Sequence, residues 1–185
     1  MKLLVLSESI QKLETEQCTN VDELKGRLNI VHDLMDFDLS MSLSASFSYA
    51  ERFMARKLQR HLIQTELLIP RNMEVSYFMK YGQCDLQYIT IEDGTRLELL
   101  KDYHVRGNRI VFMPRNQECK VTVQYNCGFC IQRCKDQVPS DVIIGILMYA
   151  GALHQVKTNV TSEYLKRAVI CSEDLFNPYR LKPKA

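Results

Sequence analysis

The chain has 185 residues, 46% of them hydrophobic and 25% charged, a composition typical of a globular protein and not of a collagen-like or disordered one. Lys and Arg number 24 against 22 Asp and Glu, a net charge of +2, which excludes binding to nucleic acid or to a membrane through bulk electrostatics. The odd count of 7 cysteines and an N-terminus without a long apolar run predict a soluble protein in a reducing compartment.

Two helices are predicted in the first third of the chain. Asn20 is a good N-cap, with Glu23 at the third helical position, and the apolar residues behind it predict a short amphipathic helix over residues 21–31. Residues 39–62 contain neither Pro nor Gly, and their apolar side chains form one stripe, which predicts the longest helix of the protein. That stripe consists of Leu39, Leu43, Phe47, Ala50, Met54 and Leu58.

After Pro70 the pattern changes to short apolar and aromatic runs separated by turn residues, which predicts an antiparallel β region over residues 72–127. Asp93 and Gly94 mark one hairpin turn, because Asp-Gly readily adopts the positive φ angles of tight turns. Gly107 and Asn108 mark a second turn. Both hairpin tips are expected to be exposed and available for contacts.

A third helix is predicted over residues 140–156, where Pro139 precedes an apolar stripe. Gly145 and Gly151 interrupt this stripe, and each costs about 1 kcal/mol relative to Ala in a helix. Glycine at two such positions indicates close packing against another helix, for which residues 39–62 are the predicted partner.

The predicted fold class is therefore α+β: a mainly helical bundle, with a long central helix and a C-terminal helix, carrying an inserted antiparallel β-hairpin region. A single domain is predicted over residues 1–160. Residues 161–185 are more polar and are interpreted as an extended C-terminal docking segment, with a short helix at residues 162–170.

Three cysteines stand within eight residues: Cys127, Cys130 and Cys134. This C-x-x-C-x-x-x-C spacing suggests a zinc or iron–sulfur site, but both normally need four ligands, and the sequence offers no clear fourth. A small metal-binding module that binds nucleic acid is the alternative function. The other interpretation is a loop between a strand and a helix, with no metal bound.

No motif in the sequence predicts catalysis. The four histidines are scattered, no Ser lies in a G-x-S-x-G elbow, and no glycine-rich phosphate loop is present. Asp33, Asp36 and Asp38 lack the pattern of a calcium-binding loop and are interpreted as a solvated connector. We therefore predict neither catalytic residues nor a cofactor.

The order of the elements resembles the head-to-tail connector, or adaptor, family of tailed bacteriophages. Residues 21–28 resemble the opening helix of that family, and residues 39–60, with Ala50-Glu51-Arg52, its long helix. Residues 123–129 followed by Val138-Pro139 resemble its strand and second long helix, and residues 175–180 resemble its ending in Pro-Tyr-Arg. The sequence departs from the family pattern at Cys127, where Ala is usual.

The resemblance implies a structural virion protein without enzymatic activity, assembled in the host cytoplasm and located in the neck between capsid and tail. Its partners would be further copies of itself in a ring, typically a dodecamer, then the portal protein, a stopper or tail-completion protein, and DNA that passes without sequence specificity; no membrane partner is implied. Contacts to the portal or to a neighbouring copy are expected at Phe176, Pro178, Tyr179 and Arg180. Contacts to the next ring are expected at Asp93, Gly94, Gly107 and Asn108.

Overall fold

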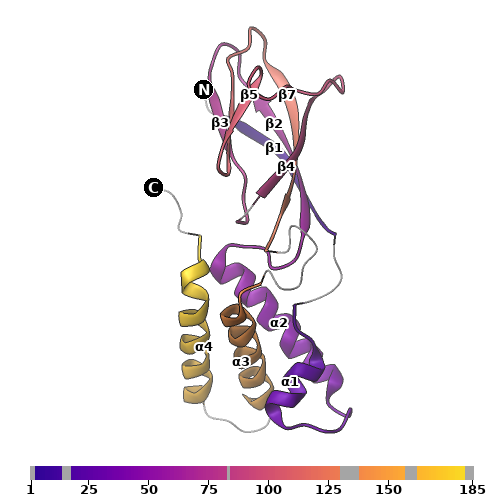
Figure 1. Cartoon of the computed structure of the whole chain (residues 1–185), viewed down its shortest axis with the longest axis vertical. Coiled ribbons are helices and arrows are strands. Elements are labelled where there is room, and N and C mark those ends of the chain that lie inside the picture. Colours follow the sequence, from indigo (N-terminus) through magenta and orange to yellow (C-terminus); the bar gives the residue numbers. More distant parts are fainter. Residues whose placement is uncertain (1–2, 14–17, 83, 130–137, 157–161, 182–185) are drawn as a thin grey trace. The chain divides into compact units, whose positions relative to one another are not determined.

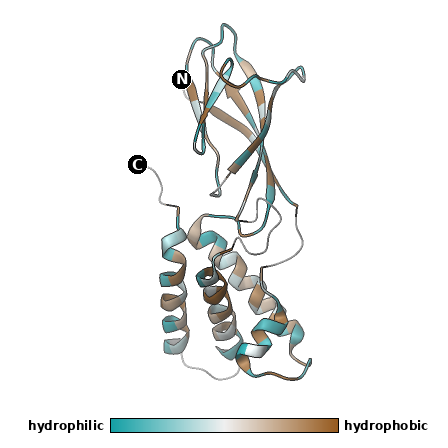
Figure 2. Cartoon of the chain, in the orientation of Figure 1, coloured by the Kyte–Doolittle hydropathy of each residue, from teal (hydrophilic) through white to brown (hydrophobic). Residues whose placement is uncertain are grey.

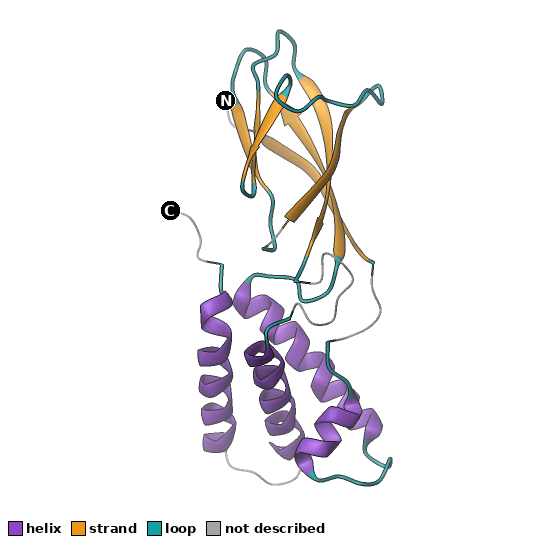
Figure 3. Ribbon diagram, viewed as in Figure 1, coloured by secondary structure: helices purple, strands orange, loops and turns teal. Residues whose placement is uncertain are grey.

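The computed structural model describes residues 3–13, 18–82, 84–129, 138–156 and 162–181 (Figure 1). The chain forms two compact units. Met1–Thr15 and Gln59–Arg133 form the β unit, and Glu16–Leu58 and Cys134–Ala185 form the helical unit. Strands and helices are segregated between them (Figure 3). Within the described ranges, no helix has both the length and the apolar character that crossing a membrane requires.

The β unit holds two antiparallel sheets, with strand orders β1-β2-β7-β4 and β3-β6-β5. One apolar core lies under both sheets, and its fully buried members include Ile63, Val123 and Phe112. The alternating burial along β2 and β7 gives each strand an inward face that contributes to this core. The strands are β1 (Leu4–Lys12), β2 (His61–Ile69), β3 (Val75–Phe78), β4 (Cys84–Ile91), β5 (Tyr103–Arg106), β6 (Arg109–Phe112) and β7 (Cys119–Cys127).

The helical unit consists of four α-helices and a short 3-10 helix in the described residues. They are α1 (Val21–Leu28), α2 (Asp36–Met54), α3 (Ser140–Val156), α4 (Ser162–Phe176) and η2 (Asn177–Tyr179). α3 packs against α1, α2 and α4, and it is strongly hydrophobic along its length (Figure 2). The predicted cap of α1 is confirmed, because the Asn20 side chain accepts a hydrogen bond from the Glu23 backbone N–H at 2.9 Å.

The predicted helix over residues 39–62 is wrong beyond Met54. Ala55 adopts a left-handed conformation with φ +54° and ends α2 without a glycine. The Glu51 carboxylate then accepts the backbone N–H of Leu58 at 2.9 Å, and the chain enters β2 at His61. The apolar stripe, which runs from Leu39 to Leu58, does not continue into residues 61–69. There the burial alternates with a period of two, and pairing with β1 and β7 on both sides forms a strand.

The mixed α+β class is confirmed, but the expectation of a mainly helical bundle is wrong. The strands form two sheets around a core of their own, and β1 was not predicted at all. Within the predicted β region of residues 72–127, residues 96–100 form only isolated bridges, such as Thr90 with Arg96. The hairpin at Gly107-Asn108 is confirmed, because Arg106 pairs with Arg109 across a two-residue loop.

A buried chain of hydroxyl groups crosses the β unit, and we expect it to stabilise the fold. The Tyr125 hydroxyl accepts the Lys80 backbone N–H at 3.2 Å and lies 3.4 Å from the Tyr77 hydroxyl, which contacts Thr65 at 3.0 Å. Burial raises the pKa of Tyr125 far above its ordinary value. Tyr125→Phe is expected to cost about 1–3 kcal/mol, because it leaves buried polar groups without a partner.

Thermal unfolding of the full chain, with hydrogen exchange of the β2 and β7 amides, would measure this cost. The control is Tyr88→Phe, because the Tyr88 ring is half-exposed beneath the Arg96 guanidinium, and its change should stay within about 0.5 kcal/mol. Equal effects of the two substitutions would contradict a structural role for the Tyr125 hydroxyl.

Candidate assembly interface

The C-terminal residues expected to dock on partners begin with Phe176, which lies inside the helical unit. Its side chain is fully buried, and its ring stands 6.2 Å from that of Phe53 on α2. A Cβ atom added at Gly145 of α3 would lie 2.5 Å from the Phe176 ring, so glycine is required for this approach. The close contacts of Gly145 and Gly151 are therefore made by Phe176 and by Leu28 of α1. The predicted partner, α2, does pack against α3, although the atoms nearest to a Cβ at these two glycines belong to other helices.

Residues 177–181 are hydrogen-bonded to residues at the C-terminal end of α2. Arg56 Nε donates to the Tyr179 carbonyl at 2.6 Å, and the Leu181 backbone N–H donates to the Met54 carbonyl at 2.9 Å. The Met54 carbonyl is one of the last carbonyls of α2, which have no partner within the helix. The Arg180 guanidinium lies 5.0 Å from the centroid of the Phe53 ring.

The expectation of an extended C-terminal tail is therefore wrong for the described residues up to Leu181. Residues 162–176 form a helix of 15 residues, and the 3-10 helix that follows folds back on α2. The physical reason is that α4 carries its own apolar residues against α3, which the polar composition of the segment concealed. Pro178 and Arg180 remain exposed, and the docking of this segment to a portal or a neighbour stays a prediction.

A polar contact also joins α4 to α2. The Tyr49 hydroxyl donates to the Glu173 carboxylate, and the Tyr49 ring lies 4.6 Å from that of Tyr149 on α3. Burial and the hydrogen bond to Glu173 raise the pKa of Tyr49 to about 12. Tyr49 is therefore a neutral donor at physiological pH, and it contacts both α4 and α3 from α2.

The two hairpin tips of the β unit present small and polar groups to solvent. Asp93 and Gly94 are exposed, and the Asp93 carboxylate accepts the Thr95 backbone N–H at 2.8 Å, which lowers the pKa of Asp93. Gly107 is exposed with φ +57°. Asn108 is partly buried, and its side-chain amide donates to the Gly82 carbonyl. Contact of these tips with a further ring stays a prediction.

Of the three clustered cysteines, the structure places Cys127 alone. It is fully buried at the end of β7, opposite His61 on β2 and Cys84 on β4. Cys130 and Cys134 lie outside the described residues. In the part of the chain that is described, no three His, Cys, Asp or Glu side chains stand close enough to hold a metal ion.

Comparison with known proteins gives a match in structure. No protein-family model matches the sequence, and no curated protein matches it. A chain in the neck of an empty gene transfer agent particle, computed with C6 symmetry, is similar with a TM-score of 0.66 at 12% identity, over 96% of this chain and 97% of that chain. This chain shares the fold of that neck protein.

Two further solved structures show the same fold. The neck of the native gene transfer agent particle, computed with C12 symmetry, contains a chain with a TM-score of 0.63 at 12% identity, over 96% of this chain and 97% of that chain. The virion of the native particle contains one with a TM-score of 0.61 at 12% identity, over 95% and 97%. Because nearly the whole chain is covered, the shared neck fold includes both the β unit and the helical unit.

One set of exposed apolar side chains was not predicted from the sequence. Val31 was assigned to the apolar face of the first helix, and the acidic segment after it was interpreted as a solvated connector, whereas Val31, Leu34 and Phe37 are 98%, 91% and 77% exposed. The signal was present in the sequence, since large apolar residues alternate with Asp between two helical patterns. Large apolar side chains gathered on a surface indicate an interaction site.

Proposed function

We propose that this protein is a structural virion protein of a tailed phage-like particle, a head-to-tail adaptor that forms a ring beneath the portal. The ring would extend the DNA channel and receive a stopper or tail-completion protein. The observation that carries the proposal is the match to neck chains over 96% of this chain. The C6 and C12 symmetries of those neck structures support a ring, with twelve copies as the favoured number.

The protein would have no catalytic role. It would be assembled in the host cytoplasm and reside in the neck of the virion. A net charge of +2 suits a channel through which DNA slides without sequence-specific contact, because each added phosphate contact strengthens binding and slows release.

Within this proposal, the exposed part of the C-terminal segment docks on the portal or on a neighbouring copy. Pro178 and Arg180 are exposed and Tyr179 is partly exposed, whereas Phe176 supports them from inside the subunit. Truncation of the chain after Lys166 would remove the docking segment and also Phe176 from the core. A loss of portal binding by the truncated chain would therefore not distinguish lost docking from lost folding. The hairpin tips at Asp93-Gly94 and Gly107-Asn108 are the proposed contacts to the next ring.

The proposal is tested by the native mass of the protein, alone and with the portal ring of the same particle. We expect a complex whose added mass equals twelve copies, as in the C12 neck. A protein that stays monomeric and leaves the portal ring unchanged would overturn the proposal. Metal analysis of the same sample tests the alternative of a zinc or iron site at Cys127, Cys130 and Cys134.

Arg180→Glu sharpens this test. It reverses the charge of an exposed residue in the proposed docking segment and removes a cation–π contact worth about 0.5–1 kcal/mol at an exposed site. The chain should therefore stay folded while its affinity for the portal ring falls at least about tenfold. Lys166→Glu, an equal charge reversal at an exposed position of α4, is the control and should bind as the unmodified protein does.

A further inference from the structure

The segment that leads from α1 into the first turn of α2 carries exposed apolar side chains, and we call its residues 31–38 the knob. Its side chains Val31, Leu34 and Phe37 are 98%, 91% and 77% exposed. Burial of such side chains is the main favourable term in protein association. A soluble monomer seldom holds so many large apolar groups together in water without a partner.

The knob is held in one conformation by its own subunit. Lys25 Nζ donates to Asp33 at 2.5 Å and contacts Asp36 at 2.9 Å, and only 10% of the Lys25 side chain is exposed. These contacts raise the pKa of Lys25 and lower that of Asp33, so both groups stay charged at neutral pH. The Asp36 backbone N–H also donates to the Asp33 carbonyl at 3.1 Å. An ordered apolar surface loses little conformational entropy when it binds.

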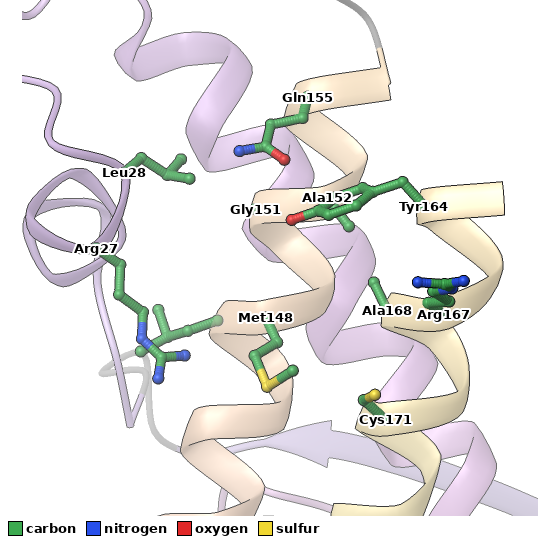
Figure 4. Close-up of a pocket in the computed structure, with 11 residues that line it drawn as sticks. Arg27, Leu28, Met148, Gly151, Ala152, Gln155, Tyr164, Arg167, Ala168 and Cys171 are labelled. Carbon is green, nitrogen blue, oxygen red and sulfur yellow. The ribbon is translucent and has the colours of Figure 1, made fainter. Parts of the chain in front are cut away.

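A pocket of about 430 Å³ lies on the same helical unit, between α1 and α4 and above α3 (Figure 4). Arg27 and Leu28 line it from α1, whereas Tyr164, Arg167 and Ala168 line it from α4. On the floor of the pocket, four of the five lining residues of α3 are small or apolar, namely Leu147, Met148, Gly151 and Ala152, and the fifth is Gln155. An apolar floor with a few polar groups at the edge is typical of a binding site.

Knob and pocket have complementary chemistry. The knob carries three Asp and neither Lys nor Arg, and the carboxylates of Asp33 and Asp36 have more acceptor positions than their contacts with Lys25 use. The pocket carries Arg27 and Arg167 at its edge, and none of the described residues that line it is acidic. Arg167 contacts Glu163 at 3.3 Å, but both side chains are more than 70% exposed. This ion pair is therefore weak, and Arg167 can exchange Glu163 for a carboxylate of the knob.

We infer that the knob of one subunit inserts into the pocket of the next copy in the ring. The apolar side chains would cover the α3 floor, and the Asp residues would meet Arg27 and Arg167. No knob residue lines the pocket of its own subunit. The contact therefore joins two different surfaces, which is the head-to-tail geometry from which closed rings are built. This inference rests on the proposed ring and names its subunit interface.

Two variants test the interface by native mass spectrometry, with and without the portal ring. Leu34→Ser with Phe37→Ser removes the knob, and Ala168→Glu places bulk and negative charge in the pocket. Each should weaken subunit association at least about 30-fold, as expected for a central contact. A mixture of the two variants should form dimers and stop, because one intact knob then meets one intact pocket.

Ile170 supplies the matched controls, because it is 57% exposed on α4 and does not line the pocket. Ile170→Ser and Ile170→Glu should assemble as the unmodified protein does. Arg167→Glu is a second pocket variant at a 78% exposed side chain, which keeps the test valid if Ala168→Glu unfolds the subunit.

The outcomes separate this inference from the proposed function. Normal rings from both knob and pocket variants would overturn the knob-in-pocket contact and leave the ring itself standing. Rings that form from the knob variant but no longer bind the portal would also overturn it, because the knob would then contact the portal. An unmodified protein that never assembles would overturn the proposed function as well.

Discussion

Phe176→Ala is expected to lower the free energy of unfolding of the helical unit by about 3–5 kcal/mol, the usual cost of deleting a buried aromatic ring. The side chain is fully buried, packs over Gly145 of α3 and faces the ring of Phe53 on α2. Its removal would leave a cavity where three helices meet. Because the chain contains no Trp, the helical circular dichroism signal during urea unfolding is the suitable measurement.

This substitution also separates a core role from a docking role. Ile170→Ala, on the same helix but 57% exposed, is the control and should change stability by no more than about 0.5 kcal/mol. If Phe176→Ala keeps its stability and loses portal binding, Phe176 is a docking residue as the sequence analysis expected. If stability falls and portal binding falls only with the folded fraction, the residue belongs to the core.

Gly128→Ala is expected to destabilise the β unit by about 2–4 kcal/mol. Gly128 has φ +128°, a conformation that costs other residues about 1–3 kcal/mol. A Cβ atom there would also lie 2.3 Å from the Gln59 carbonyl oxygen. That oxygen belongs to the backbone just before β2, so relief of the clash would require movement of the chain itself.

Gly94→Ala separates the cost of the positive φ from the cost of the clash with the backbone. Gly94 also has a positive φ, +85°, but no atom lies within 4 Å of the position that a Cβ would take. The substitution should therefore cost only the conformational part, about 1–2 kcal/mol. Thermal unfolding and hydrogen exchange of the β2 and β7 amides would compare the variants. Equal effects at both positions would show that the approach of Gly128 to Gln59 contributes nothing to stability.

Elements with strong local signals were predicted well. The N-cap at Asn20, the helix that starts at Ser140 and the turn at Gly107-Asn108 all depend on interactions between residues close in sequence. Capping hydrogen bonds and glycine conformations act over three or four residues, so the sequence displays them directly.

The elements that were missed depend on distant residues. Residues 61–69 follow directly on the predicted long helix, and they form a strand because they pair with β1 and β7 on both sides. β1 itself is exposed along most of its length and owes its conformation to β2. Their paired residues lie 64 positions apart in sequence at Leu4 with Leu68 and 49 positions apart at Lys12 with His61.

The residues of the candidate interface also fall into two groups, those that could be predicted from the sequence and those that could not. The aromatic and basic residues at the C-terminus and the glycines of the hairpin tips could be identified from residue type alone. The burial of Phe176 could not, because it requires α3, α2 and α4 together around Gly145. The pocket between α1 and α4 also exists only when both helices pack on α3.

The sequence by itself determined the mixed α+β class, the start of three helices, the hairpin turns and the near-neutral charge, because each follows from short-range interactions or from composition. Only the tertiary structure decided where α2 ends, which strands share a sheet, and whether an apolar residue is buried or exposed. Phe176 and Phe37 show why: they are the same residue type on helices, yet one is fully buried and the other 77% exposed. Burial is set by what packs against a side chain, and those neighbours come from distant parts of the chain.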